Sequence, residues 1–210
     1  MKKFLSIAVL MALVGCGAVP RTPVEDQKAA LDSKQLCCVD LKAVNYEPLV
    51  VNSPKKAILD EAAPVKQFSR GSSYFKAFSI PAGEKQGIWI KSYFNGMYIK
   101  QFLRPLVLFL REDHSLIGTA IPRMQFREGN LFGDSSARME GGVIVPPNAR
   151  YLLVYTAAFD SGPGAINTAP STGVLMLGNT PVVTSDAGKS IDLEASTTGE
   201  LALELKQFLN

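Results

Sequence analysis

The sequence lacks a strong excess of charge of either sign and has only one histidine. Lysine and arginine together number 22, aspartate and glutamate 19, and the formal net charge is +3. So balanced a chain has no basic surface with which to coat nucleic acid, and we expect no nucleic-acid partner. Charged residues make up 20% and hydrophobic residues 47%, a composition that excludes intrinsic disorder and favours a folded core.

The motifs of common enzyme classes are also missing. The single histidine, His114, lies in a turn-like segment, and no Gly-x-Ser-x-Gly motif accompanies it, which argues against a serine hydrolase. A two-carboxylate glycosidase stays open in principle. However, the acids near expected strand ends are better explained as solvated loop residues: Asp113, Asp134, Glu140 and Asp160. Walker A, dinucleotide-binding and calcium-loop patterns are absent. We therefore expect a non-enzymatic protein with no metal and no bound cofactor.

Residues 1–15 resemble the leader of a bacterial lipoprotein. Lys2 and Lys3 precede an apolar stretch, Phe4 to Val14, which is followed by Gly15 and Cys16. The stretch is about 11 residues long, whereas crossing a bilayer takes about 20. We therefore predict cleavage before Cys16 and not a retained membrane helix. An ordinary secretory signal with an incidental cysteine is the alternative.

Lipidation would make Cys16 a membrane anchor. Its thiol would carry a diacylglycerol and its new amino terminus an acyl chain such as palmitate, and several chains together bind a bilayer stably. The resemblance to lipoproteins, with Gly17 following the anchor, implies sorting to the bacterial outer membrane, facing the periplasm. Residues 16–36 are predicted to hold the anchor, a proline-containing spacer and a short surface helix from Val24 to Leu36.

The rest of the chain, residues 37–210, is typical of an antiparallel β-sandwich, jelly-roll-like in type. Short apolar runs bounded by turn residues predict strands at Ser73–Ile80, Gly87–Phe94, Leu103–Arg111, Gly142–Val145, Arg150–Ala158, Val174–Leu177 and Leu201–Leu205. The unbroken run Leu106–Leu110 predicts a central strand covered on both faces, and so does Tyr151–Tyr155. The segment Asp160–Thr172 lacks apolar periodicity and is predicted to be a loop, flexible or part of a binding surface.

Cys37 and Cys38 are adjacent in the sequence, and in an oxidising compartment free thiols do not persist. They could form a strained disulfide between neighbours, pack as small apolar side chains in the first strand, or take part in redox chemistry or metal binding. Zinc binding lacks partner ligands, since the only histidine stands alone. A structural role is the favoured interpretation.

The aromatic residues Trp89, Tyr93 and Tyr98 are candidates for ligand binding. Trp89, Lys91 and Tyr93 share one face of their predicted strand, and Tyr98 follows in the next turn. An aromatic platform of this kind stacks against the apolar face of a sugar ring while nearby polar groups hold its hydroxyls. The alternative is that Trp89 and Tyr93 fill the core of the sandwich, the commoner place for a strand aromatic.

Three stretches of sequence resemble the MalM family, the periplasmic protein of the bacterial maltose operon. They are Leu36-Cys37-Cys38, the segment Gly71–Pro81 (GSSYFKAFSIP) and the strand Arg150–Thr156 (RYLLVYT). The resemblance covers about Leu36 to Leu205, and the chain differs from a soluble periplasmic member in having a lipobox.

The resemblance implies an accessory, non-enzymatic role in maltose or maltodextrin transport, by binding sugar or by contact with an envelope transport protein. It carries no catalytic residue onto this chain. An envelope interaction or assembly lipoprotein with no small-molecule ligand is the alternative.

Overall fold

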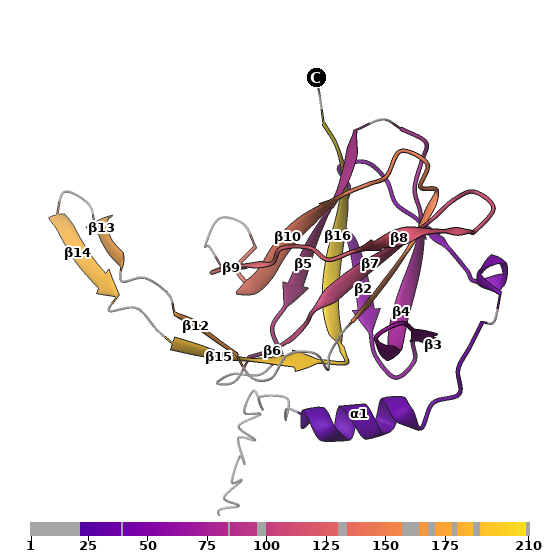
Figure 1. Cartoon of the computed structure of the whole chain (residues 1–210). Helices are drawn as coiled ribbons and strands as arrows, with labels where there is room; N and C mark the ends of the chain where they lie inside the picture. Colours follow the sequence, from indigo (N-terminus) through magenta and orange to yellow (C-terminus); the bar gives the residue numbers. More distant parts are fainter. Residues whose placement is uncertain are drawn as a thin grey trace, which may run out of the picture.

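The structure is a computed structural model that describes residues 22–38, 40–83, 85–95, 100–129, 134–156, 164–167, 171–177, 180–186 and 190–208. These residues form a mainly β fold in which two sheets pack face to face, with one α-helix at the beginning (Figure 1). The predicted mainly β sandwich with a short N-terminal helix is thus confirmed. Among the described residues, no helix has the length and apolar character that crossing a bilayer requires.

The first sheet has its apolar strands in the middle. In spatial order it contains β1 (Glu47–Pro48), β4 (Gly71–Ser79), β11 (Tyr151–Thr156), β7 (Pro105–Leu110) and β8 (Leu116–Ala120), with β3 (Val65–Phe68) also paired to β4. All pairs are antiparallel except β1 with β4. The two strands that the sequence predicts to be covered on both faces, β7 and β11, lie next to each other within this sheet.

The second sheet faces the first across the core. Its spatial order is β2 (Lys55–Leu59), β16 (Gly199–Gln207), β5 (Gln86–Tyr93), β10 (Arg138–Ile144) and β9 (Gln125–Arg127). All of its pairs are antiparallel. Along β16, Leu201, Leu203 and Leu205 are buried and alternate with partly exposed residues, which confirms the predicted one-sided strand.

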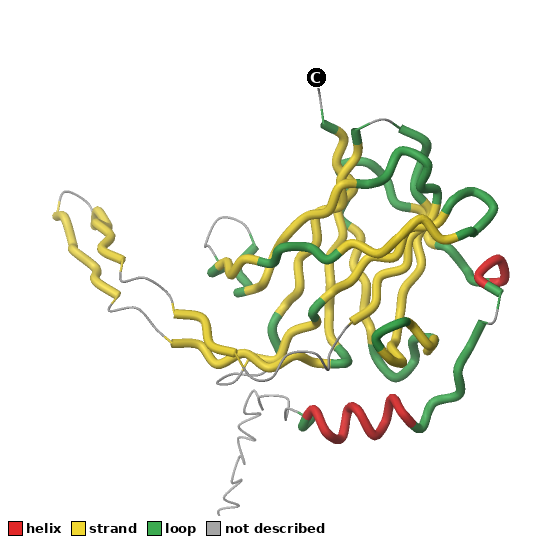
Figure 2. Tube along the Cα trace, viewed as in Figure 1, coloured by secondary structure: helices red, strands yellow, loops and turns green. Residues whose placement is uncertain are grey.

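An extension of strands leaves the sandwich beside its helix (Figures 1 and 2). Here β12 (Gly164–Asn167), β15 (Ser190–Ser196) and β6 (Lys100–Leu103) form one small sheet, and β13 (Ser171–Leu177) with β14 (Thr180–Asp186) forms a hairpin. We call β12, β15 and the hairpin the arm, and β13–β14 the ribbon. The prediction of a loop over Asp160–Thr172 is wrong where β12 and the first residues of β13 lie.

All seven predicted strands are present with shifted ends, as parts of β4, β5, β7, β10, β11, β13 and β16. Several short strands are not predicted from the sequence, among them β2 (KKAIL) and β3 (VKQF). In both of these, charged or amide side chains interrupt the apolar pattern, so the alternation is too short to recognise. Sheet pairing with β16 and β4 supplies the missing stabilisation.

The apolar side chains of the first sheet divide between two clusters. Val107, Phe109, Leu152 and Val154 join the leucines of β16 in the core between the sheets. On the opposite face, a second cluster consists of Phe68, Phe75, Ala77, Leu106, Leu110, Leu153 and Tyr155. The stacking of Phe68 on Tyr155, with ring centroids 3.8 Å apart, is part of this outer cluster.

The segment from Cys37 to Tyr46 covers the outer cluster. Cys37, Cys38, Leu41, Val44 and Tyr46 pack against it, and this stretch includes the 3₁₀-helix η1 (Leu41–Ala43). The Tyr46 hydroxyl donates a hydrogen bond to the Leu41 carbonyl oxygen at 2.9 Å, which closes the segment on itself. Burial, followed by the charge of Tyr151, raises the pKa of Tyr46 to about 12.

His114 lies beside this segment, in the turn between β7 and β8. Its φ of 66° is in the left-handed region that tight turns use, as the sequence predicts for a turn residue. The imidazole stacks on Tyr151 with ring centroids 4.3 Å apart, and it also contacts Tyr46. The single histidine therefore helps to pack the covering segment against the first sheet.

The helix α1 (Val24–Asp32) is shorter than the predicted Val24–Leu36. Pro23 begins it, and Glu25 and Asp26 in its first turn suit the positive end of the helix dipole. It ends at Asp32, where the Ser33 amide donates to the Ala29 carbonyl oxygen, and beyond it the Cys37 amide donates to the Val65 carbonyl oxygen at 2.7 Å.

One buried glutamine fixes α1 to the sandwich. The sequence predicts that a narrow apolar face of Val24, Ala29 or Ala30, and Leu31 leaves the helix on the surface, but the structure buries Gln27 together with Leu31. The Gln27 Oε1 atom accepts hydrogen bonds from the Ser196 hydroxyl (2.7 Å) and the Thr197 amide (3.1 Å). Its Nε2 atom donates to the Gln101 Oε1 atom at 3.0 Å. A polar residue, which a hydrophobic pattern does not reveal, therefore docks the helix.

We predict that Gln27→Ala lowers the free energy of unfolding by about 2 to 3 kcal/mol, because buried donors on Ser196 and Thr197 lose their acceptor. Urea denaturation followed by circular dichroism measures the change. The matched control is Gln35→Ala at an exposed position just after the helix, which should change the free energy by less than about 0.5 kcal/mol. Equal effects of the two substitutions would contradict the role given to Gln27.

Candidate functional site

The outward face of the second sheet carries the aromatic residues that the sequence singles out. Along β5, Ile88 and Ile90 belong to the core, whereas Trp89, Lys91 and Tyr93 alternate with them and are only partly buried. The prediction that these three residues share a face is confirmed. The alternative that Trp89 and Tyr93 fill the core of the sandwich is wrong, since they lie on the side of the sheet away from it.

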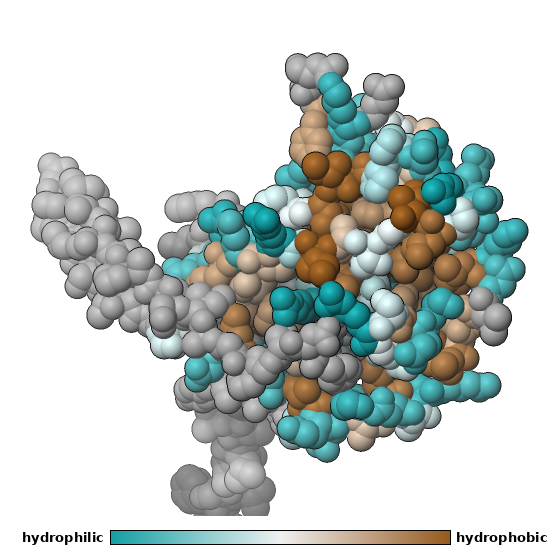
Figure 3. Space-filling model, viewed as in Figure 1, coloured by the Kyte–Doolittle hydropathy of each residue, from teal (hydrophilic) through white to brown (hydrophobic). Residues whose placement is uncertain are grey.

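We call this surface the open face. The pairing of β5 with β10 and β16 places neighbouring residues on it in cross-strand rows. Gly142 and Glu204 flank Trp89, Glu140 and Ala202 flank Lys91, and Ile144 and Lys206 flank Gly87. Ile144 is 78% exposed, and Phe208, just beyond β16, is 52% exposed. In Figure 3, apolar surface gathers below the C-terminal end of β16.

A slot of about 260 Å³ opens on this face around the single tryptophan. Its lining consists of Gly87, Ile88, Trp89, Gly142, Val143, Ile144, Lys206 and Phe208. Two glycines make the slot possible. A Cβ atom at Gly142 would lie 2.9 Å from the Trp89 ring, and one at Gly87 would lie 2.8 Å from the Phe208 ring. The absence of side chains there leaves both rings accessible from the slot.

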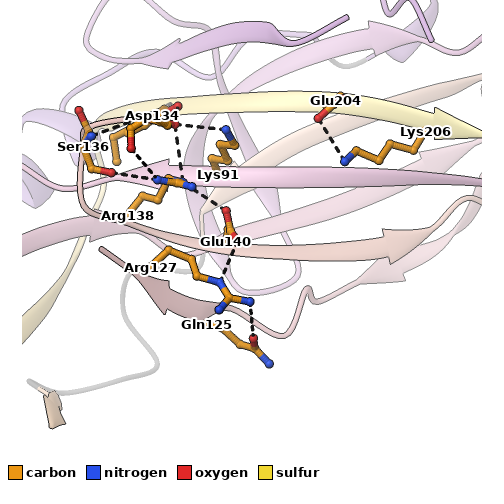
Figure 4. A network of polar contacts seen from close by, with 10 residues as sticks. Lys91, Gln125, Arg127, Asp134, Ser136, Arg138, Glu140, Glu204 and Lys206 are labelled. Carbon is orange, nitrogen blue, oxygen red and sulfur yellow. Dashed lines mark hydrogen bonds and ion pairs between the residues drawn. The ribbon is translucent and has the colours of Figure 1, made fainter. Parts of the chain in front are cut away.

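A cation lies beside the tryptophan. The Lys206 Nζ atom is 5.7 Å from the centroid of the Trp89 ring, within the range of a cation–π interaction. The same ammonium group lies 3.4 Å from the Glu204 carboxylate. Figure 4 shows the Glu204–Lys206 pair on β16. A polar donor and a polar acceptor thus stand at the edge of an otherwise apolar slot.

Farther along the open face, Asp134 brings several polar groups together. Its Oδ2 atom accepts a hydrogen bond from the Tyr93 hydroxyl at 2.7 Å and lies 3.2 Å from the Lys91 Nζ atom. Partial burial raises the pKa of Asp134, but the hydrogen bonds from Tyr93, Lys91 and the Ser136 amide, together with the charge of Arg138, outweigh it, and the net pKa is lowered. Burial and the bond to Asp134 raise the pKa of Tyr93 to about 12. Tyr93 is therefore a neutral hydrogen-bond donor at physiological pH.

Arg138 links Asp134 to a second carboxylate (Figure 4). Its Nε atom is 3.2 Å from the Glu140 Oε2 atom and 3.6 Å from the Asp134 Oδ2 atom. Glu140 also accepts from the Arg127 Nε atom at 2.9 Å. The side chains of Arg138 and Glu140 are 10% and 12% exposed, so this pair is shielded from water far more than a typical surface ion pair.

The interpretation of the candidate acids as solvated loop residues is thus corrected for two of them. Glu140 lies within β10, and Asp134 is in a polar network. Asp113 fits the interpretation, since it is exposed and accepts a hydrogen bond from the Ser115 amide. Hydrogen bonds from Ser115 lower the pKa of Asp113. Asp160 lies outside the described residues.

Cys37 and Cys38 are joined by a disulfide, the first of the interpretations left open by the sequence. Their Cα atoms are 3.7 Å apart, the usual spacing across one trans peptide bond. The alternative of two free thiols packed in the first strand is wrong, because the cysteines are bonded to each other and precede η1 in an irregular segment. The Cys38 carbonyl oxygen accepts a hydrogen bond from the Lys66 Nζ atom at 2.9 Å. The pair therefore belongs to the segment that covers the first sheet, as expected for a structural role.

A second pocket, of about 280 Å³, lies beside this disulfide. It is lined by Cys38, Ala43, Val44, Asn45, Glu47, Pro64, Phe75, Lys76 and Ala77. The hydrogen bond from Lys55 lowers the pKa of Glu47 there. Within the described ranges, no group of three or more histidine, cysteine, aspartate or glutamate side chains is arranged to hold a metal ion. Cys16 and Tyr98, the other two predicted site residues, lie outside the described residues.

Comparison with known proteins gives no relative from which a role could be transferred. No protein family model matches this chain, and no curated protein matches it. The candidate function therefore depends on the chemistry of the open face and on the sequence features described above.

We predict that Gly142→Ala displaces the Trp89 indole, because the new Cβ atom would lie 2.9 Å from the ring. Since Trp89 is the only tryptophan, the intrinsic fluorescence of the folded protein should shift in wavelength or intensity. The control is Gly118→Ala on β8, where no atom lies within 4 Å of the new Cβ, and its spectrum should match that of the unsubstituted protein. An unchanged spectrum for Gly142→Ala would show that the ring does not pack over Gly142.

Proposed function

We propose that this protein is a lipid-anchored, non-enzymatic envelope protein that binds a neutral carbohydrate on its open face. In this proposal it is a MalM-like accessory in maltose or maltodextrin transport. The observation that carries the proposal is the outward-facing Trp89 in an apolar slot with polar side chains at its rim.

Sugar rings have an apolar C–H face and a polar rim, and the open face offers matching surfaces. Trp89 and Phe208 provide aromatic surface on which the C–H face can pack. Glu204 and Lys206 adjoin the slot and present an acceptor and a donor for hydroxyl groups. The row of Tyr93 and Lys91 continues along the same strand, so that an extended oligosaccharide would meet further polar groups.

The charges on the open face favour a neutral ligand. Each cation of the group described above has a carboxylate partner: Lys206 with Glu204, Lys91 with Asp134, and Arg127 and Arg138 with Glu140. An anionic ligand would have to compete with these carboxylates for the cations. A neutral polyol can hydrogen-bond to the paired groups and leave the pairs intact.

The same pairing supports a non-enzymatic role. A glycosidase needs one carboxylic acid with a raised pKa to protonate the leaving group. Asp134, the acid with the most contacts on the open face, instead has a lowered pKa and is held as a carboxylate. Its hydrogen bonds to Tyr93 and Lys91 position these side chains for binding.

The location is proposed from the leader. Cys16 would carry the diacylglycerol and acyl chain, and the domain would be tethered to the outer membrane on its periplasmic side. There it could bind maltodextrin directly or contact a transport component. The exposed Ile144 and Phe208 favour a protein contact as the second candidate, with an envelope protein and no small ligand.

We predict that Trp89→Ala raises the dissociation constant for maltoheptaose at least tenfold, a loss of about 1.4 kcal/mol, because the stacking surface is removed. Titration calorimetry of the mature chain measures the change, and Trp89→Phe should restore part of the affinity. Ile121→Ala, an exposed apolar position outside the slot, is the control. Absence of binding by the unsubstituted protein would exclude direct sugar recognition, and crosslinking in cells would then test the transport-protein contact.

We also predict that Cys16→Ser prevents incorporation of labelled palmitate in a bacterial host, because the thiol that starts the lipid modification is removed. Cys37 and Cys38 provide the control, because their replacement by serine should leave the label in place. Label retained by Cys16→Ser would exclude this cysteine as the lipidation site.

A further inference from the structure

The longest charge-free part of the sequence outside the leader provides β12 and nearly all of the ribbon. No charged residue occurs between Asp160 and Asp186, in a chain of which 20% of the residues are charged. This stretch contains β12, β13 and most of β14. Exposed strand edges in soluble proteins are usually protected by charged side chains, lysine above all. Here β13 has no charged residue, and β14 has only Asp186 at its end, at the base of the ribbon.

The ribbon changes from polar to apolar along its length. At its base, Ser171 pairs with Asp186, Thr172 with Ser185 and Gly173 with Thr184. Toward the turn the paired rows are Val174 with Val183, Leu175 with Val182, Met176 with Pro181 and Leu177 with Thr180. β13 and β14 pair only with each other in the described part of the chain, and Figure 1 shows the ribbon projecting away from the sandwich.

Both faces of the ribbon are apolar near its turn. Successive rows of a ladder fall on opposite faces, so the Val174–Val183 row is on one face and the Leu175–Val182 row on the other. A flat partner surface that packed on the ribbon would cover one face only. An apolar environment that surrounds the turn end of the ribbon removes both of its apolar faces from water. The four rows from Val174–Val183 to Leu177–Thr180 span about 10 Å along the ribbon, which matches the depth of about 5 to 10 Å to which apolar groups enter the interface of a bilayer.

Thr22, the first residue that the structure describes, lies close to the arm. The Gln101 Nε2 atom on β6 donates hydrogen bonds to the Thr22 carbonyl oxygen (3.2 Å) and to the Glu194 Oε2 atom on β15 (3.0 Å). Thr22 is thus held beside the strands from which the arm extends. From Cys16 to Thr22 the chain spans about 20 Å at most. A lipid on Cys16 would therefore keep this end of the molecule within about 20 Å of the membrane surface.

We propose that the turn end of the ribbon inserts into the lipid surface and forms a second membrane contact beside the lipid anchor. The proposal relies on the membrane location in the proposed function for its setting. With the lipid at Cys16 and the ribbon both in the bilayer, the domain is held in a fixed orientation and does not rotate freely about a flexible spacer.

The test uses residues 16–210 with Cys16→Ser, so that no acyl chain contributes to binding. A single reporter, Leu175→Trp, is introduced in a Trp89→Phe background and mixed with phosphatidylcholine vesicles whose acyl chains do or do not carry bromine. We expect a blue shift on vesicle addition and quenching by brominated lipid. The matched control, Thr172→Trp at the base of the ribbon, should show neither change.

Two further measurements separate lipid insertion from other contacts. Raising NaCl from about 0.05 to about 0.5 M should not weaken vesicle binding, because the ribbon rows that insert carry no charge. Leu175→Asp with Val182→Asp should lower the vesicle-bound fraction at least tenfold, with the far-ultraviolet circular dichroism and the urea midpoint unchanged.

The proposal is overturned if Leu175→Trp is not quenched. It is also overturned if its emission changes with protein concentration and not with lipid, which would indicate pairing of two copies through the ribbon. Neither result affects maltoheptaose binding or palmitate labelling of Cys16. Conversely, if the protein did not bind carbohydrate, the Cys16→Ser chain would still bind vesicles. Failure of ribbon insertion and failure of the proposed function can therefore be told apart.

Discussion

The need to bury both faces of the first sheet determines the layout of this protein. β7 and β11 are apolar on both sides, and each large aliphatic side chain removed from water contributes about 1.5 to 3 kcal/mol. The second sheet covers one face, and the segment from Cys37 to Tyr46 covers the other. Only one face of the second sheet packs against the core. Its open face is consequently available for polar networks and for an accessible tryptophan.

The strands that the sequence predicts well are those whose pattern results from this burial. The run Leu106–Leu110 indicates a doubly covered strand, and the alternation from Leu201 to Leu205 indicates a strand with one wet face; both predictions are confirmed. Strands such as β2 and β3 are missed, because their stability comes from pairing with β16 and β4 and not from their own residues. The same limit applies to α1, which Gln27 docks through hydrogen bonds to residues far away in the chain.

The open face shows which parts of a site a sequence can reveal. The period of two along β5 is enough to place Trp89 beside Lys91 and Tyr93. It cannot show that Gly142 lies opposite Trp89, or that Lys206 and Phe208 complete the slot, because these neighbours depend on sheet register across strands distant in sequence. Asp134 illustrates the same point. From the sequence it is an ordinary loop residue, but in the structure its carboxylate accepts hydrogen bonds from Tyr93 and Lys91.

The contacts of Gln27 also bear on the order in which the chain can fold. Its partners are Ser196 at the end of β15 and Thr197 in the bend that follows, and β16 occupies an inner position in the second sheet although it is the last strand of the described residues. Such long sequence separations make folding slow, because distant segments must meet before their contacts stabilise anything. During synthesis from the N-terminus, the second sheet cannot be completed until the chain has emerged as far as Gln207. Until then the leucines of β16 are missing from the core between the two sheets, so a growing chain lacks the packing that stabilises both of them.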